Sequence, residues 1–113
     1  MKKKTVFLLA ILSSTLTFTF AVAKHHTPED RGMIHFNNPE FAGGKRACNS
    51  CHPNGRDLEG AGAKSSFAIM GGKQGSLEEA VNVCVVNANK GNEIKIDSTE
   101  MQEMVSYIKS LGK

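Results

Sequence analysis

The residues best suited to chemistry form one short run, CNSCH, at positions 48–52. Two thiols separated by two residues and followed at once by an imidazole suit three kinds of site: a dithiol redox pair, part of a zinc site, or covalent attachment of a haem. A third cysteine, Cys84, lies further along the chain. The choice between these chemistries depends on the compartment, because free thiols persist in the cytoplasm and are oxidised or occupied outside it.

The N-terminus predicts export. Three lysines at positions 2–4 are followed by an apolar segment and by the small residues Ala21 and Ala23, which together describe a cleavable secretory signal over residues 1–23. A retained membrane anchor is the alternative, but five Ser and Thr residues interrupt the apolar segment between positions 13 and 19. We therefore expect the functional chain, residues 24–113, in the periplasm with no retained anchor.

The composition of residues 24–113 excludes some partners and demands extra stabilisation. These residues carry 11 Lys and Arg against 11 Asp and Glu, because three of the 14 basic residues lie in the signal. The balance gives no reason to expect nucleic acid or an anionic membrane as partner. One small domain with 11 glycines and no Trp has a limited core, so disulfides, a metal or a cofactor must support it.

In an exported chain, C-x-x-C-H predicts attachment of haem c. Cys48 and Cys51 would add to the haem vinyl groups, and His52 would be the proximal axial ligand of the iron. A dithiol pair would need a βαβ setting, structural zinc would need a second Cys/His pair, and a Cys48–Cys51 disulfide would close too small a loop to stabilise much. We therefore predict one covalent haem c with its iron, and no catalytic residues.

Helical patterns surround a loop-rich middle. Thr27 precedes Pro28 and two acids as a helix start, and this helix ends before Pro39. A second helix begins after Ser76 with a capping box and ends at Gly91, and a third begins after Ser98. Glycines interrupt residues 40–75, and no segment there alternates strongly enough to predict a strand. The fold class predicted is all-α, one domain over residues 24–113.

Four segments of the chain resemble the small monohaem periplasmic cytochromes c: RGMIHF (31–36), CNSCHPNG (48–55), LEEAVNVCVVNANKG (77–91) and STEMQEMVSYIKSL (98–111). The resemblance implies a cytochrome c-like domain of three to four helices with glycine-rich loops around the haem. In such cytochromes a glycine and an aromatic residue on the first helix pack against an aromatic residue on the last. Gly32, Phe36 and Tyr107 match those positions, and only glycine lets two helix backbones cross so closely.

The distal ligand of the iron departs from the pattern of that family, because the connector 87–98 holds no Met, His or Cys. Cys84 is the first candidate: it lies on one stripe of the second helix, and some sulfur-oxidising cytochromes with a similar segment use a cysteine thiolate. Its alternative role is a buried free thiol. Met101 and Met70 are alternative distal ligands, with core packing and loop packing as their other roles. The remaining possibilities are an open site or one of the following residues: Met104, Asn89, Lys90, His25, His26 and His35.

Electron transfer is the function that these features favour, since a haem with both axial positions filled changes oxidation state with little rearrangement. We expect a monomer that meets its redox partner proteins through a small transient interface. Two alternatives stay open. One is a haem subunit of a sulfur-compound (thiosulfate-type) oxidoreductase. The other is a gas-binding or sensor cytochrome with an open or weak sixth ligand.

Overall fold

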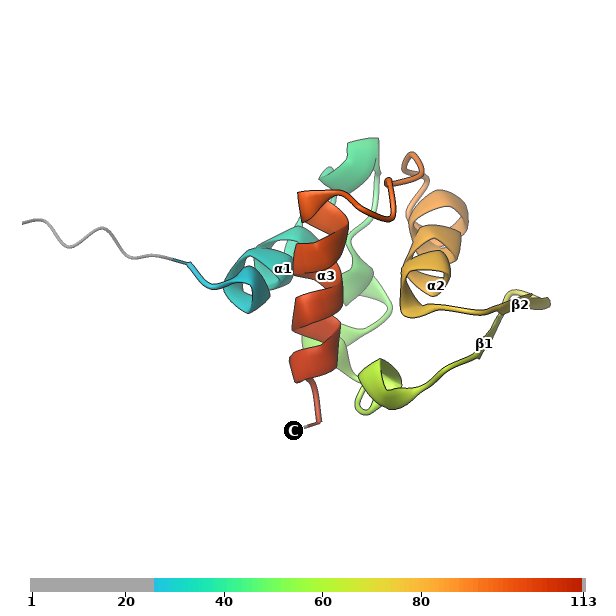
Figure 1. Ribbon diagram of the computed structural model, residues 1–113. Coiled ribbons are helices and arrows are strands. Elements are labelled where there is room, and N and C mark those ends of the chain that lie inside the picture. The colour runs from blue at the N-terminus through green and yellow to red at the C-terminus, as the bar shows by residue number, and fades with distance from the viewer. Residues whose placement is uncertain (1–25, 113) are drawn as a thin grey trace, which may run out of the picture.

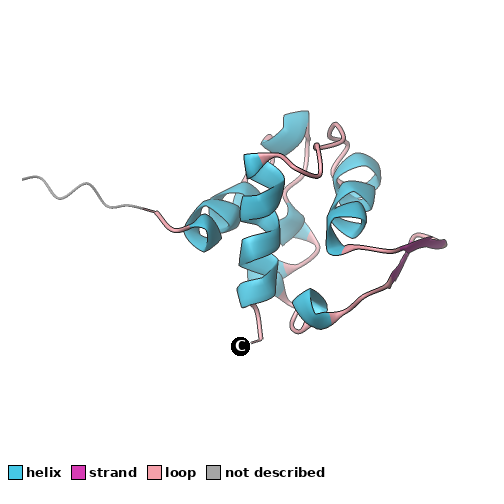
Figure 2. Cartoon of the chain, in the orientation of Figure 1, coloured by secondary structure: helices cyan, strands magenta, loops and turns pink. Residues whose placement is uncertain are grey.

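The computed structural model describes residues 26–112, which contain three α-helices and one β-hairpin (Figures 1 and 2). The helices are α1 (Pro28–Asn37), α2 (Leu77–Val83) and α3 (Thr99–Ser110), and the strands are β1 (Phe67–Ile69) and β2 (Gly72–Gln74). Short 3-10 turns occupy much of the chain between α1 and β1. The predicted signal over residues 1–23 and His25 lie outside the described residues. Within residues 26–112, no helix is long and apolar enough to cross a membrane.

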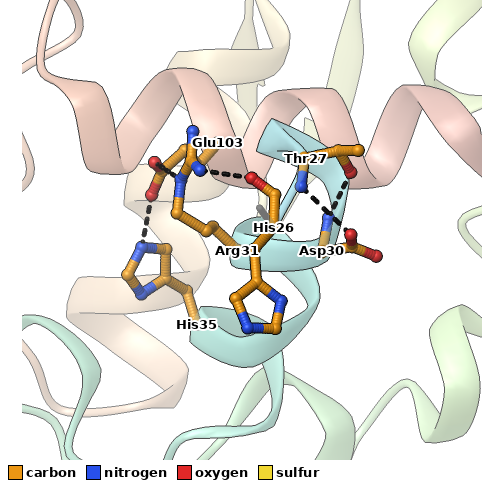
Figure 3. Close-up of polar contacts among 6 residues, drawn as sticks. All are labelled: His26, Thr27, Asp30, Arg31, His35 and Glu103. Atoms are coloured by element: carbon orange, nitrogen blue, oxygen red, sulfur yellow. Dashed lines mark hydrogen bonds and ion pairs between the residues drawn. The ribbon is translucent and has the colours of Figure 1, made fainter. Parts of the chain in front are cut away.

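All three α-helices begin at the capping residues that the sequence predicts. At α1, the Thr27 hydroxyl accepts from the Asp30 amide at 3.1 Å, and the Thr27 amide donates to the Asp30 carboxylate at 3.0 Å (Figure 3). Ser76 and Ser98 cap α2 and α3 in the same way, by accepting from backbone amides. These bonds satisfy amides that have no partner inside a helix. The helix starts are therefore set locally.

Helices α1 and α3 cross in close contact, as Figure 1 shows. A Cβ atom on Gly32 would lie 2.0 Å from the carbonyl oxygen of Glu103, so only glycine fits at the crossing. The rings of Phe36 and Tyr107 meet beside it with centroids 5.1 Å apart and planes tilted by 60°. This arrangement confirms the predicted packing of the two helices. Met33, the neighbour of Gly32, is 44% exposed.

A buried carboxylate joins the same two helices. Glu103 of α3 receives hydrogen bonds from Arg31 and His35 of α1, the second at 2.8 Å, and only 6% of the residue is exposed (Figure 3). Burial by itself would raise the pKa of Glu103, but the hydrogen bonds and charges of its two partners outweigh burial and lower the pKa below its ordinary value. The carboxylate is thus held in its charged form at the helix crossing.

The fold is mostly helical, and the all-α prediction needs one correction. Strands β1 and β2 pair antiparallel, with Phe67 opposite Gln74, around the two-residue turn Met70-Gly71. Both turn residues have positive φ, of 49° and 79°, as two-residue hairpin turns of type I′ require. Periodicity did not reveal the hairpin because each strand has only three residues, and β2 consists of Gly72, Lys73 and Gln74, with no apolar side chain.

The hydrophobic core lies between α1, α3 and the segment that follows α2. Its largest fully buried side chains are Phe36, Val85, Met101 and Met104. The last two come from α3, which also buries Val105 and Ile108. Figure 1 shows α2 on the other side of the domain from α1, with α3 in front of the loops. The side chains between these elements leave the cavity described next.

Candidate functional site

The CNSCH run folds into one tight turn. Cys48–Ser50 form a 3-10 turn, and the carbonyl of Cys48 accepts from the amides of both Cys51 and His52, at 3.2 and 3.0 Å. The Asn49 side chain then accepts from the amide of Asn54 at 2.8 Å, which fixes the following loop. The two thiols and the imidazole are therefore carried on one short, internally bonded piece of backbone.

A backbone contact fixes the tautomer of His52. Its Nδ1 lies 2.9 Å from the carbonyl oxygen of Arg56. A carbonyl can only accept, so Nδ1 carries the proton and Nε2 keeps a free lone pair. A hydrogen bond at one ring nitrogen that orients the other toward a metal is the usual arrangement for a metal-binding histidine. His52 is therefore prepared to act as a ligand through Nε2.

Next to this turn is a small apolar cavity of about 80 Å³. His52 is the one lining side chain that carries a nitrogen or oxygen donor, and the cavity's walls come from α1, α2, α3, β1 and the loops between them. The lining residues are Phe36, Cys48, His52, Leu58, Ala61, Phe67, Ile69, Leu77, Ala80, Val81, Cys84, Met104 and Ile108. Such walls suit a large apolar ligand with one ligating atom.

The cavity brings together Cys48 and Cys84, which are 36 positions apart in the sequence. Cys84 opens a π-helical turn, Cys84–Ala88, that continues α2, and such turns frequently mark functional sites. No disulfide joins the three cysteines, and Cys51 is exposed. Burial raises the pKa of both Cys48 and Cys84; the nearby thiols Cys48 and Cys51 raise that of Cys84 further. Without a cation nearby, Cys84 thus favours its neutral form.

Two of the three methionines considered as distal ligands, Met101 and Met70, do not line the cavity. Met101 is fully buried in the core and does not line the cavity. Met70 is 63% exposed at the tip of the hairpin, and its neighbour Ile69 lines the cavity in its place. Met104 does line the cavity, from α3. Of the histidines offered, His35 is bonded to Glu103, and His26 is exposed at the start of the described chain.

Sequence reasoning treated Asn89 only as a possible iron ligand and missed its contact with the CNSCH turn. The residue is 6% exposed, and its side-chain amide donates to the sulfur of Cys48 at 3.3 Å. This bond lowers the pKa of the Cys48 thiol but does not cancel the effect of burial. Asn89 lies at the end of the π-helical turn, two residues before Gly91, and that position was the only sequence signal for it.

A family model described as the SoxA/TsdA cytochrome c domain matches residues 31–113. The chain belongs to this family. No curated protein and no solved structure matches the chain. The matched range includes the CNSCH turn, the cavity and Cys84, and it confirms the predicted resemblance to small c-type cytochromes. A cytochrome c domain carries covalently bound haem c, so haem c with its iron is the cofactor of this SoxA/TsdA domain.

The residues of this SoxA/TsdA domain fit that cofactor. The cavity supplies apolar walls, Cys48 lines it, Cys51 follows in the same tight turn, and His52 offers one free ring nitrogen. A thiol, Cys84, and a thioether, Met104, are the sulfur atoms available on the lining outside the CNSCH turn. The chain can thus supply two points of attachment, one nitrogen ligand and one sulfur ligand.

Proposed function

We propose that the domain is an exported electron carrier whose haem c is attached through Cys48 and Cys51, with His52 as the proximal ligand. The observation that carries this proposal is the free Nε2 of His52 beside an apolar cavity that also includes Cys48. When bound, haem c supplies the one-electron couple between Fe(II) and Fe(III). The chain holds the imidazole in one orientation through the Arg56 carbonyl, and its apolar walls keep water away from the ring.

Cys84 is the distal ligand in this proposal. It lines the cavity, whereas Met101 lies in the core and Met70 lies in solvent. Burial keeps the thiol of Cys84 neutral in the protein alone, but a coordinating thiol loses its proton because the charge of the metal favours the thiolate. His52 and Cys84 would be the residues that hold the iron, and a thiolate ligand would favour its oxidised state.

Electrons would enter and leave near the exposed part of the CNSCH turn, at Cys51. A small domain with one such border exchanges electrons through transient contacts with partner proteins, and it can do so as a monomer. The signal predicted over residues 1–23 would deliver the chain to the periplasm. Residues for acid–base or nucleophilic catalysis are not needed for this role.

A haem subunit of a sulfur-compound oxidoreductase is the second candidate function. The observation that favours it is the same thiol at the cavity, because the sulfur-oxidising cytochromes that the segment after Ser76 resembles use a cysteine thiolate. In that case Cys84 would belong to the reaction site of a complex. Turnover of thiosulfate by the purified domain or by its complex separates this function from electron transfer alone.

The test compares the holo-protein with its Cys84→Ser variant. Imidazole added to the oxidised protein must displace the distal ligand, so we expect it to bind weakly to the wild type and much more tightly to Cys84→Ser. The oxidised wild type should also lack the weak far-red band of methionine-ligated haem. Met104→Leu is the matched control and should behave as the wild type. Equal imidazole affinity in the wild type and Cys84→Ser would exclude Cys84 as ligand.

A further inference from the structure

Asn89 makes three hydrogen bonds that join the two sides of the cavity. Its side-chain amide donates to the sulfur of Cys48 at 3.3 Å, and its carbonyl accepts from the backbone amide of Lys45 at 2.8 Å. Its own amide donates to the carbonyl of Cys84 at 3.0 Å. One buried residue therefore contacts the segment that carries the attachment cysteines and the turn that carries Cys84.

The backbone around Asn89 leaves this residue little freedom. It ends the π-helical turn, and the next residue, Lys90, has a positive φ of 61°. The amide of Gly91 then returns to the carbonyl of Val85 at 2.9 Å. Because Val85 is fully buried in the core, the end of the turn is anchored on the side away from the cavity. The contact with Cys48 and Lys45 anchors it on the side of the CNSCH turn.

A second buried asparagine on the same segment provides a comparison. Asn82 is 8% exposed and forms two bonds with Ile94, donating to its carbonyl at 2.8 Å and accepting from its amide at 2.9 Å. These bonds hold the connector before α3 and do not reach the cavity lining. Asn82 and Asn89 are therefore the same residue type, similarly buried and close in sequence. They differ in their partners: Asn82 bonds to the connector before α3, and Asn89 bonds to the Cys48 segment.

We propose that Asn89 is a positioning residue that holds Cys84 at the distal side of the haem by tying its π-helical turn to the Cys48 segment. The inference rests on the proposed function, because it assumes that Cys84 is the distal ligand. Loss of the side-chain amide would leave the turn joined to residues 45–48 by a single backbone bond, the one from Lys45 to Asn89. Cys84 would then leave its position more easily when another ligand competes for the iron.

The experiment measures the imidazole affinity of oxidised holo-protein for the wild type, Asn89→Leu and Asn82→Leu. Leucine has the same branching at Cγ as asparagine, is somewhat larger, and cannot donate to sulfur. The net contribution of one hydrogen bond corresponds to about a fivefold change in an equilibrium constant, so Asn89→Leu should bind imidazole about fivefold more tightly than the wild type. Asn82→Leu should lower resistance to denaturant at least as much as Asn89→Leu and leave imidazole affinity unchanged.

An unchanged affinity in Asn89→Leu, or an equal increase in both variants, overturns the inference, since the second result would reflect general loosening of the segment. If Asn89→Leu yields no holo-protein, Asn89→Ser keeps the backbone bonds, removes the amide and carries the same expectation. Wild-type affinity equal to that of Cys84→Ser overturns the inference through the ligand assignment, and this outcome is distinct from a failure of the Asn89 variants alone.

Discussion

The α1–α3 crossing and the cavity wall formed by α2 and the hairpin are held together by different means. At the crossing, Gly32 allows backbone contact, the rings of Phe36 and Tyr107 fill the space, and a buried carboxylate bonds to the opposite helix. Along the wall, the apolar side chains of Phe67 and Val81 line a cavity of about 80 Å³. Apolar surface of this kind gains stability when a ligand covers it. The crossing is thus stabilised by contacts within the protein, whereas the stability of the cavity wall depends on the cofactor.

The largest effect is expected when the cofactor can no longer be attached beside the cavity wall. Replacing Cys48 and Cys51 together by Ala should abolish covalent haem attachment, because no thiol of the CNSCH turn remains for a thioether. Mass spectrometry of protein made in a host competent for cytochrome maturation should give the mass of the bare chain. Cys84→Ser is the control and should keep the mass of the haem. Covalent haem in the double variant would contradict the proposed attachment.

The second largest effect is expected for a substitution that disrupts the α1–α3 crossing and leaves the cavity wall unchanged. Gly32→Ala should destabilise the fold by about 3 kcal/mol, since the added methyl group would meet the backbone of α3 at Glu103. Denaturant unfolding of the holo-protein measures the loss. Gly75→Ala is the control: its Cβ would approach nothing closer than 3.8 Å, so the change should be small. If the two variants unfold alike, the crossing is not as tightly packed as the structure shows.

The third effect concerns the dependence of the crossing on pH. The pKa of Glu103 is lowered in the folded protein, so the carboxylate contributes stability that is present above its ordinary pKa of 4.5 and is lost as pH falls through its lower folded value. Glu103→Gln should cost about 2 kcal/mol at neutral pH, the scale of hydrogen bonds to a charged group. The cost should shrink below pH 4.5. Unfolding midpoints measured across this range check the trend, and a cost that grows in acid would reverse it.

The smallest effect sharpens the role of the hairpin. Met70 is 63% exposed at its tip, so Met70→Leu should leave the absorption spectrum unchanged and alter stability by no more than about 0.5 kcal/mol. Spectra of the oxidised and reduced holo-protein provide the measurement. A shift of the haem bands in Met70→Leu would show that this methionine reaches the iron after all.

The sequence predicts the parts of this domain that depend on neighbouring residues. Thr27, Ser76 and Ser98 bond to amides three residues away, so their types and positions are enough to locate the helix starts. The contact of α1 with α3 was predictable for a different reason, because a glycine and an aromatic residue one turn apart resemble those of known cytochromes. The CNSCH run likewise carries its chemistry within five residues.

The parts that were not predictable depend on distant contacts. The bond from Asn89 to Cys48 spans 41 positions, and the donor is a residue type that is common in loops. The hairpin is too short for alternation to appear, and its turn begins with Met70, which gives no signal for positive φ. The placement of Cys84 and Met101 also follows from packing, since both lie on apolar helical stripes and only one of them lines the cavity.

The bond between His52 and residue 56 has a consequence for how this domain tolerates change. The acceptor is a main-chain oxygen, so no replacement of the Arg56 side chain deletes it. The orientation of the imidazole is therefore set by the backbone conformation. A substitution at position 56 can change the charge or polarity of the surface without removing this hydrogen bond. A substitution of Gly55 would change the orientation of the imidazole, because the φ of 77° at Gly55 and its proximity to Leu111 determine the conformation of the intervening loop.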